Sequence, residues 1–411
     1  MRMNFLQTLF NFLRLSTGAF QITKKYHRLL ILRNHKWLTP AEPVIPLTYV
    51  LRAYINGNIT PNSFEGSFGA HSYRFGCSAR SLLFKLLSEL KQKNGNSRNE
   101  VLIPAYTCYS VAAAIVKAGL TIKIYDLDPR TFNPDLNSIS RYLSERTIAV
   151  VSQHLFGIPA DIEGINEIAH AEGGVHIEDA AQAMGGRGYW GYLGAKGDYG
   201  LFSFGRGKPL PLGSGGMLIA QKNANEIKNM RNFGPFGLGE IANMIAISIF
   251  SKPVLYRFIE TLPIGLGQTK FDPKFEIGEM STATKHLYYV CAPLLDSYNL
   301  HRRKIAEIYR ERLSPNGLIA EPQGSSCVYT RFPYLAPSWK VAQRLRQYGI
   351  RQMYPKSLNR ESEIVPYISN PEEEAPGAME IARRLITLPT HSLVSATTAA
   401  QVCKALKDEI G

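Results

Sequence analysis

Three side chains in the middle of the sequence have types and spacing that suit chemistry on a cofactor. Asp179 ends the apolar run VHIED, Gln182 follows three residues later, and Lys208 comes 29 residues after Asp179 in a glycine-rich stretch. An acid at the end of a buried strand can face a ligand, and glycines beside a lysine permit close backbone approach. A lysine that forms a Schiff base and a carboxylate that keeps a pyridine nitrogen protonated are what pyridoxal phosphate (PLP) chemistry needs.

Other interpretations of the same stretch are weaker. The residues GRGK (205–208) are similar to the end of a P-loop, but Phe202 stands where that motif needs glycine and Pro209 where it needs Ser or Thr. The histidines between 154 and 176 lack the spacing of metal ligands, so we expect no metal site. An Asp and a Lys this far apart are more often a solvated pair, and the catalytic interpretation therefore depends on the surrounding pattern.

From about residue 76 the sequence alternates between predicted strands and predicted helices. Apolar or alternating runs indicate strands, and segments of helical period that end at glycine lie between them. The predicted strands, some running on into a turn, are 101–106, 121–128, 147–157, 175–183, 199–205 and 215–221, and the predicted helices are 80–93, 110–119 and 162–174. This order predicts a mainly parallel α/β sheet sandwiched by helices, with its site at the carboxyl ends of the strands.

Length and composition indicate a globular protein of more than one domain. The 411 residues are 45% hydrophobic and 19% charged, which excludes a disordered or fibrous chain. We expect a basic N-terminal extension (1–60), a large α/β domain (61–280) with a hydrophobic insertion at 240–267, and a small α+β C-terminal domain (281–411). The elements expected in the last part are a helix at 281–313, strands near 326–335 and a final helix near 396–409.

The charge of the chain indicates an anionic partner. Lys and Arg number 47 against 33 Asp and Glu, a net charge of +14. Residues 3–15 have the period of an amphipathic helix, and the apolar segments 241–250 and 254–266 are each too short to span a bilayer. No nucleic-acid-binding motif appears, so we expect no nucleic acid. Five widely spaced cysteines and no signal peptide predict free thiols and a cytoplasmic protein.

The run from 101 to about 221 resembles the DegT/StrS-type sugar aminotransferases, also called the DegT/DnrJ/EryC/StrS family. The matching segments, in order, are VLIPAYT, KAGLTIKIYDLDPRTFNPD, HLFGIPADI, IEDAAQAMGG, GAKGDYGLFSFGRGK and LGSGG. Weaker similarity extends over about 75–405. The resemblance implies a PLP-dependent transferase of fold type I.

The resemblance also implies roles for the lysine, the acid and the amide of this central stretch. Lys208 would hold the cofactor as an internal aldimine and shuttle a proton between the substrate Cα and the cofactor C4′ carbon. Asp179 would pair with the pyridine nitrogen, Gln182 would bond the ring hydroxyl, and Ser203 would bind the phosphate.

A further set of cofactor contacts is implied at the start of the helix that follows GCS. Ala79, Arg80 and Ser81 would open that helix beneath the phosphate, where backbone N–H groups favour an anion. The family usually has Ser-Gly-Thr-Ala here, so Arg80 replaces the threonine. A role for Arg80 on the helix surface is the competing interpretation.

Two further departures from the family pattern affect the stacking on the cofactor ring and the contact with the partner subunit. The residue after Thr107 is usually an aromatic that stacks on the cofactor, and here it is Cys108. Tyr106, Tyr109 and His154 are the candidates to replace it. The segment that usually reaches the phosphate of the partner subunit is not recognisable, and the hydrophobic insertion stands in its place.

These observations predict a PLP-dependent aminotransferase, working as a homodimer, that moves an amino group from glutamate to a nucleotide-linked keto sugar. The pathway would be the synthesis of a surface polysaccharide or glycan. The alternative hypothesis is a non-catalytic or regulatory protein that kept the fold and contacts the membrane. Peripheral contact through 1–40 and 241–266, at the inner face of the membrane, is compatible with either hypothesis.

Overall fold

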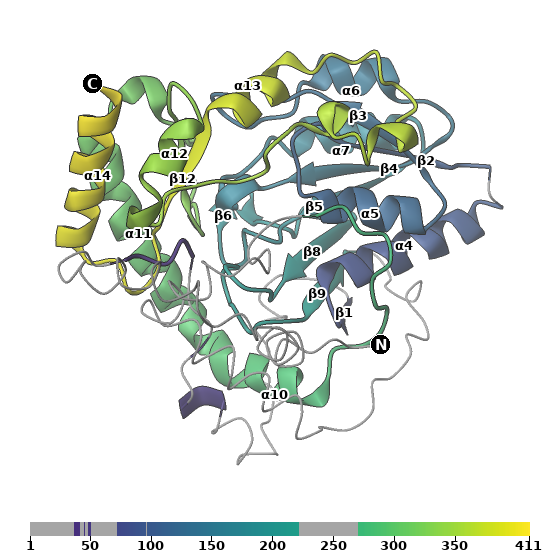
Figure 1. Ribbon diagram of the computed structural model, residues 1–411. Coiled ribbons are helices and arrows are strands. Elements are labelled where there is room, and N and C mark those ends of the chain that lie inside the picture. Colours follow the sequence, from purple (N-terminus) through teal and green to yellow (C-terminus); the bar gives the residue numbers. More distant parts are fainter. Residues whose placement is uncertain (1–36, 42–44, 46–47, 51–71, 96, 222–269) are drawn as a thin grey trace, which may run out of the picture.

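The apolar runs of the sequence form a seven-stranded sheet in the computed structural model (Figure 1). In spatial order its strands are β1 Ser72–Gly76, β9 Gly216–Ala220, β8 Tyr199–Ser203, β5 Val175–Asp179, β4 Thr147–Gln153, β2 Glu100–Pro104 and β3 Thr121–Tyr125. β9 is antiparallel to both of its neighbours, and all other neighbouring pairs are parallel. Every residue of β2 and β4 is buried, as expected for strands covered on both faces.

The structure describes residues 37–41, 45, 48–50, 72–95, 97–221 and 270–411. The helix predicted at 3–15 and the apolar segments 241–250 and 254–266 lie outside these ranges. Within them, no helix is both long enough and apolar enough to cross a membrane.

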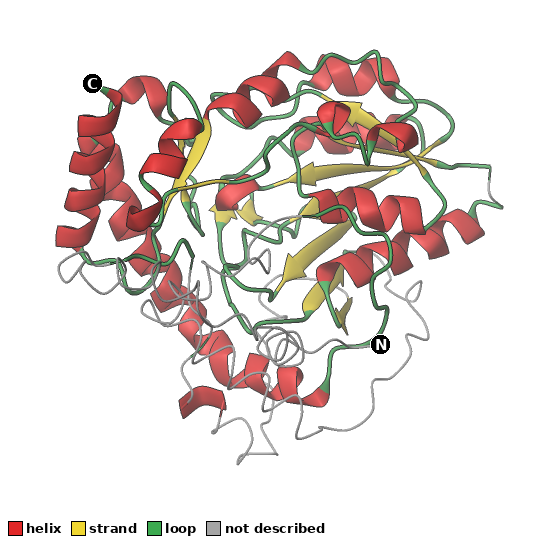
Figure 2. Cartoon of the chain, in the orientation of Figure 1, coloured by secondary structure: helices red, strands yellow, loops and turns green. Residues whose placement is uncertain are grey.

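Within the described residues, four helices flank the large sheet, and their connections place them on both of its faces (Figure 2). They are α4 Ala79–Lys93, α5 Tyr109–Lys117, α6 Leu136–Tyr142 and α7 Glu163–Ala171. α5 joins β2 to β3, whereas α6 and α7 lead the chain back in the opposite direction to β4 and then β5. Because such crossovers are right-handed, α5 lies on one face and α6 and α7 on the other. α4 packs beside α5, and the predicted mainly parallel sheet between helices is confirmed.

A second, three-stranded sheet belongs to the C-terminal part of the chain. Its order is β10 Phe332–Leu335, β12 Leu385–Leu388 and β11 Arg351–Gln352, and both pairs are antiparallel. The helices of this part are α11 Leu295–Arg312, α12 Lys340–Arg344, α13 Pro376–Arg384 and α14 Ala396–Ile410. α11 packs against α14, so helices and an antiparallel sheet together make up this region.

A carboxylate from the large sheet caps a helix of the C-terminal part. Asp126 follows β3, and its two oxygens accept the N–H groups of Gly377 at 2.9 Å and Ala378 at 2.8 Å in the first turn of α13. An anion at a helix N-terminus satisfies backbone donors that would otherwise lack partners. α13 accordingly lies beside α6 in Figure 1, and the two sheets are linked on this side of the structure.

Several elements differ from the prediction. The single helix expected at 281–313 is α10 Thr282–Cys291 followed by α11, because Pro293 interrupts the helical hydrogen bonds between them. β1, α6 and α13 were not predicted. The strand expected at 175–183 ends at Asp179, since residues 181–185 form a turn.

Candidate active site

Three neighbouring parallel strands place the predicted acid and the predicted phosphate ligand at one edge of the sheet. Asp179 is the last residue of β5, where it lies opposite Gln153 of β4 and Leu201 of β8. Ser203, two residues after Leu201, is the last residue of β8. Because the strands run in the same direction, both side chains stand at the carboxyl edge, the usual location of sites in such sheets.

The carboxyl group of Asp179 is partly buried and interacts with a nearby positive charge. Its Oδ1 accepts the N–H of Ala181 at 3.0 Å. Burial raises the pKa of Asp179 above its usual range, while the charge of Lys208 and, to a lesser extent, the Ala181 hydrogen bond and His154 oppose that rise. The structure therefore brings together the acid and the lysine that are 29 residues apart in the sequence.

The Lys208 loop, residues 205–209, is fixed by its own backbone and by α11. The Lys208 N–H donates to the Gly205 carbonyl at 3.3 Å. On the other side of Lys208, the buried Arg302 donates from Nη1 to the Pro209 carbonyl at 3.0 Å. The lysine side chain is only partly exposed, and the loop that carries it follows directly from β8 and Ser203.

Residues 37–41 lie against the Lys208 loop and are held there by hydrogen bonds to the C-terminal part of the chain. His391 Nε2 donates to the Thr39 carbonyl at 2.8 Å, and Leu38 N–H donates to the Gln347 carbonyl at 3.0 Å. Gly207 has a φ of +70°, and a Cβ added there would lie 2.9 Å from the Cβ of Ala41. The N-terminal extension predicted from the sequence thus includes a short segment that packs against the loop of the candidate catalytic lysine.

We expect Gly207→Ala to lower the free energy of unfolding by about 1–2 kcal/mol and to reduce activity as well. An L-residue is strained at this positive φ, and the added methyl must displace Ala41 or the Lys208 loop. Gly95→Ala is the matched control, because Gly95 has a φ of +58° with nothing within 4 Å of an added Cβ. Urea unfolding and activity assays should show strain in both variants but loss of activity only at Gly207. Equal activity in the two variants would contradict the prediction.

The start of α4 lies beside the last residue of β8 and the first residue of β9. Gly216 pairs with Ser203, and a Cβ on Gly216 would lie 2.5 Å from the backbone nitrogen of Ala79. Ser78 caps the helix by accepting the N–H of Ser81 at 3.1 Å. First-turn N–H groups have no acceptor within the helix, so Ser203 and the Ala79 amide form a corner that suits an anion such as a phosphate.

The side chains of Arg80 and Ser81 are engaged with residues 270–278. Arg80 Nη1 donates to the Asp272 carbonyl at 3.3 Å, and its guanidinium carbon lies 4.4 Å from the centre of the Phe275 ring. Ser81 is fully buried, and its Oγ accepts the N–H of Gly278 at 3.2 Å. These side chains therefore hold residues 270–278 against α4, and they leave the backbone N–H groups of the first turn as the groups predicted to face a phosphate.

The amide of Gln182 is oriented by three neighbours. Its Oε1 accepts from the Phe156 N–H at 3.1 Å and from Thr330 Oγ1 at 3.4 Å, and its Nε2 donates to Tyr354 Oη at 3.3 Å. Because the Phe156 amide can only donate, the oxygen of Gln182 must face it. The structure thus places Gln182 between the large sheet and two residues of the C-terminal part.

Tyr106 and His154, two of the candidates for stacking on the cofactor ring, lie in the interior of the structure. Both side chains are buried, with Tyr106 0% and His154 1% exposed, so neither offers a free face to a bound ring. His154 Nδ1 accepts the Ala160 N–H at 3.1 Å, which leaves Nε2 to donate to Glu178 Oε2 at 2.8 Å. Tyr109, the third candidate, is 2% exposed and donates to the Lys356 carbonyl.

The carboxylate of Glu178 is fully buried directly behind Asp179. Besides His154, it accepts the N–H groups of Gly194 at 2.8 Å and Lys196 at 2.7 Å. Burial by itself acts to raise the pKa of Glu178, but the hydrogen bond from His154 and the backbone donors outweigh it, and the pKa is lowered. A carboxylate with a lowered pKa stabilises the fold above its ordinary value of 4.5, and that contribution is lost as pH falls through the lowered value.

We expect Glu178→Gln to lower the free energy of unfolding at neutral pH by about 3 kcal/mol, because an amide nitrogen would face buried donors. The deficit relative to the wild type should shrink as pH falls below 4.5 and through the lowered pKa, because the wild-type carboxylate progressively loses its stabilising contribution over that range. Urea unfolding at two pH values measures this. Glu89→Gln is the control, because Glu89 forms a partly exposed pair with Lys85 on α4 and should change stability by less than about 0.5 kcal/mol. A deficit at Glu178 that does not depend on pH would contradict the prediction.

Tyr354 and Thr330, the two C-terminal residues that hydrogen-bond to Gln182, were not predicted from the sequence. No local period or motif marks them, and only the packing of the C-terminal part against the large sheet brings them to the site. Within the described residues, no group of three or more His, Cys, Asp or Glu side chains could hold a metal ion.

Comparison with known proteins agrees with this geometry. Residues 62–407 match the DegT/DnrJ/EryC1/StrS aminotransferase family. The chain is 30% identical over 300 residues to the "Pleiotropic regulatory protein" of Geobacillus stearothermophilus, covering 71% of this chain and 73% of that protein. It is 29% identical over 324 residues to a dTDP-4-dehydro-2,3,6-trideoxy-D-glucose 4-aminotransferase of Saccharopolyspora spinosa, covering 76% and 79% of the two chains.

A solved structure shows the same fold. The aminotransferase TlmJ from Streptoalloteichus hindustanus superposes with a TM-score of 0.68 over 91% of this chain and 98% of that one, at 23% identity. The family match covers most of the chain and includes the Asp179 edge, the Lys208 loop and the C-terminal part. This chain therefore belongs to the DegT/DnrJ/EryC1/StrS aminotransferase family.

Proposed function

We propose that this protein is a PLP-dependent aminotransferase that transfers an amino group from glutamate to a nucleotide-linked keto sugar. The observation that carries the proposal is the arrangement at the carboxyl edge of the large sheet, where Asp179 and Ser203 end neighbouring strands and the charge of Lys208 acts on the Asp179 carboxyl. An acid, an anion-binding corner and an amine are the groups that this cofactor needs.

Each of these groups has a task that its chemistry allows. When bound, PLP supplies a ring that accepts electrons from the reacting carbon. Asp179 would hold a proton on the ring nitrogen, and Ser203 with the first N–H groups of α4 would bind the phosphate. The Lys208 amine would attach the cofactor and then move a proton to and from the substrate carbon.

The proposed keto-sugar acceptor rests on the net charge of this chain and on the substrate named for a relative. The name of the Saccharopolyspora spinosa relative states a dTDP-linked keto sugar as its substrate. A net charge of +14 is compatible with an anionic nucleotide diphosphate in this chain too. We extend the proposal to a homodimer that works in glycan synthesis and contacts the membrane peripherally through 1–40 and 241–266.

The test is an assay of the full chain with PLP, glutamate and a panel of dTDP-, UDP- and GDP-linked keto sugars. Formation of 2-oxoglutarate together with an amino sugar, identified by mass spectrometry, supports the proposal. A chain that binds PLP but forms neither product with any member of the panel is not an aminotransferase for these sugars. A chain that does not bind PLP is better described by the regulatory alternative, which the name of the Geobacillus relative favours.

The membrane contact has its own test. Sedimentation with anionic liposomes would compare the full chain with a version that lacks residues 1–36, which keeps the described segment 37–41 in place. Equal recovery of both proteins in the supernatant would remove the contact through the N-terminal residues.

A further inference from the structure

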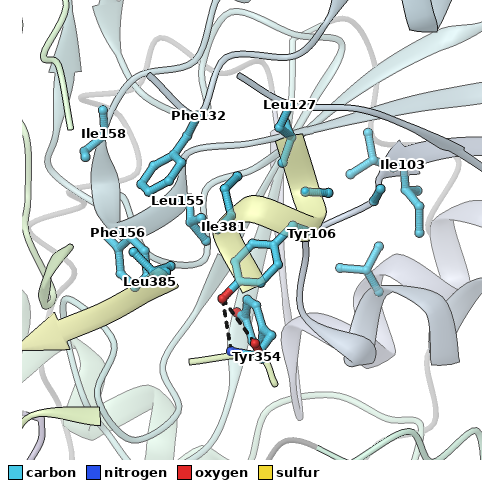
Figure 3. Packing of buried hydrophobic residues seen from close by; sticks show 14 of the residues in the cluster. Ile103, Tyr106, Leu127, Phe132, Leu155, Phe156, Ile158, Tyr354, Ile381 and Leu385 are labelled. Carbon is cyan, nitrogen blue, oxygen red and sulfur yellow. Dashed lines mark hydrogen bonds between the residues drawn. The ribbon is translucent and has the colours of Figure 1, made fainter. Parts of the chain in front are cut away.

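Tyr354 reaches the candidate site from the C-terminal part of the chain. It follows β11 by two residues and is 2% exposed. The phenol of Tyr106 binds its backbone on both sides, since Tyr106 Oη accepts the Tyr354 N–H at 3.2 Å and donates to the Tyr354 carbonyl at 3.3 Å. Figure 3 shows these two bonds and the two rings, whose centroids lie 5.4 Å apart. Tyr106, directly after β2 and Ala105, therefore fixes the position of Tyr354.

The side chain of Tyr354 lies among the groups of the site. Its Oη accepts from Gln182 Nε2 at 3.3 Å. Burial raises the pKa of Tyr354 well above its usual range, and the neighbouring Cys108 and Asp179 raise it further. The phenol therefore remains protonated and neutral at physiological pH, and its oxygen can accept a hydrogen bond from Gln182.

Among the hydrogen bonds within the described residues, those of the Gln182 amide leave one of its N–H groups unused. Two donors, the Phe156 amide and Thr330 Oγ1, occupy its oxygen. Its nitrogen carries two protons, and Tyr354 takes one of them. The remaining N–H is fixed in direction, because a planar amide held at three points cannot rotate.

We propose that Tyr354 is a positioning residue for the cofactor, holding the Gln182 amide so that its second N–H meets the ring hydroxyl of PLP. This inference rests on the proposed function. It makes a residue of the C-terminal part act on the cofactor through Gln182 and through no direct contact of its own. Tyr106 is then the support behind Tyr354, which is a role that differs from the stacking considered from the sequence.

The test is a double-mutant cycle on Tyr354→Phe and Gln182→Ala in the full chain. The readouts are the dissociation constant of PLP and the pH at which the bound cofactor changes colour, since a hydrogen bond to the ring hydroxyl affects both. Loss of one hydrogen bond should weaken PLP about fivefold in Tyr354→Phe and shift the colour transition. In the Gln182→Ala background, the same substitution should have almost no further effect.

Tyr309→Phe is the matched control. It removes another buried phenol, one that donates to the Pro389 carbonyl at 2.7 Å, and it should lower stability without moving the colour transition. Wild-type PLP affinity and colour transition in Tyr354→Phe would overturn the inference, as would an equal effect of that substitution with and without Gln182. Failure of the wild-type chain to bind PLP would overturn the proposed function, and the inference with it.

Discussion

Lys208→Ala is expected to abolish amino transfer, with a fall in kcat/KM of at least ~10⁴-fold. The Lys208 amine has two tasks in the proposed reaction, attachment of the cofactor and proton transfer at the substrate carbon, and alanine can perform neither. The fold should survive, because the contacts of this loop with Gly205 and Arg302 use backbone atoms of residues 208 and 209. Steady-state kinetics measures the loss, and the visible band near ~420 nm of the loaded protein should disappear.

A second substitution separates the amine from its charge. Lys208→Arg keeps a positive charge beside Asp179 but provides no amine that can attach an aldehyde. It should be as inactive as Lys208→Ala, whereas Lys404→Ala, at an exposed position on α14, should keep wild-type activity. Activity in Lys208→Arg close to that of the wild type would show that the lysine acts only through its charge, and the proposed role would be wrong.

The central strands could be predicted from the sequence because burial on both faces gives them a continuous apolar signal. Residues 101–103 and 148–151 are examples, and both runs lie in fully buried strands. β1 was missed because SYRFG has polar and partly exposed residues in its first half, as expected at the edge of a sheet. The single helix predicted at 281–313 overlooked Pro293, whose effect on a helix is local and could have been foreseen.

The residues of the candidate site also fall into those that could be predicted from the sequence and those that could not. Asp179, Ser203 and Lys208 could be predicted, because each lies at the end of a strand or in the loop that follows one. Tyr354 could not, since its contact with Gln182 is created by the packing of one part of the chain on another. The contacts of Arg80 were equally hidden, because they depend on the return of residues 270–278 to α4.

Asp179 shows a conflict between stability and function that its pKa makes measurable. Burial raises the pKa of the Asp179 carboxyl, so the folded protein holds the ionised form less readily than the unfolded chain does. Ionised Asp179 therefore destabilises the cofactor-free fold at pH values above the ordinary carboxyl range, and this cost vanishes when pH falls below that range. The charge of Lys208 opposes the cost, which couples the two residues even before a cofactor binds.

Asp179→Asn should lower kcat/KM by ~10³-fold, because an amide cannot keep the pyridine nitrogen protonated through an ionic pair. The same substitution should raise the free energy of unfolding of the cofactor-free protein at neutral pH, since it removes a buried charge. That gain should disappear as pH is lowered to where the wild-type carboxyl is protonated. Kinetics and urea unfolding across this pH range test both parts.

The two halves of this prediction must hold together for the proposed role of Asp179. A variant that is less active and also less stable at neutral pH would indicate that Asp179 is a structural residue whose loss disturbs the sheet edge. A variant that is more stable yet almost inactive would show that the chain keeps an unfavourable buried charge for use in the reaction. In Lys208→Ala the pKa of Asp179 should rise further, because the charge that opposes burial is gone, and the stability gained from Asp179→Asn should be larger in that background.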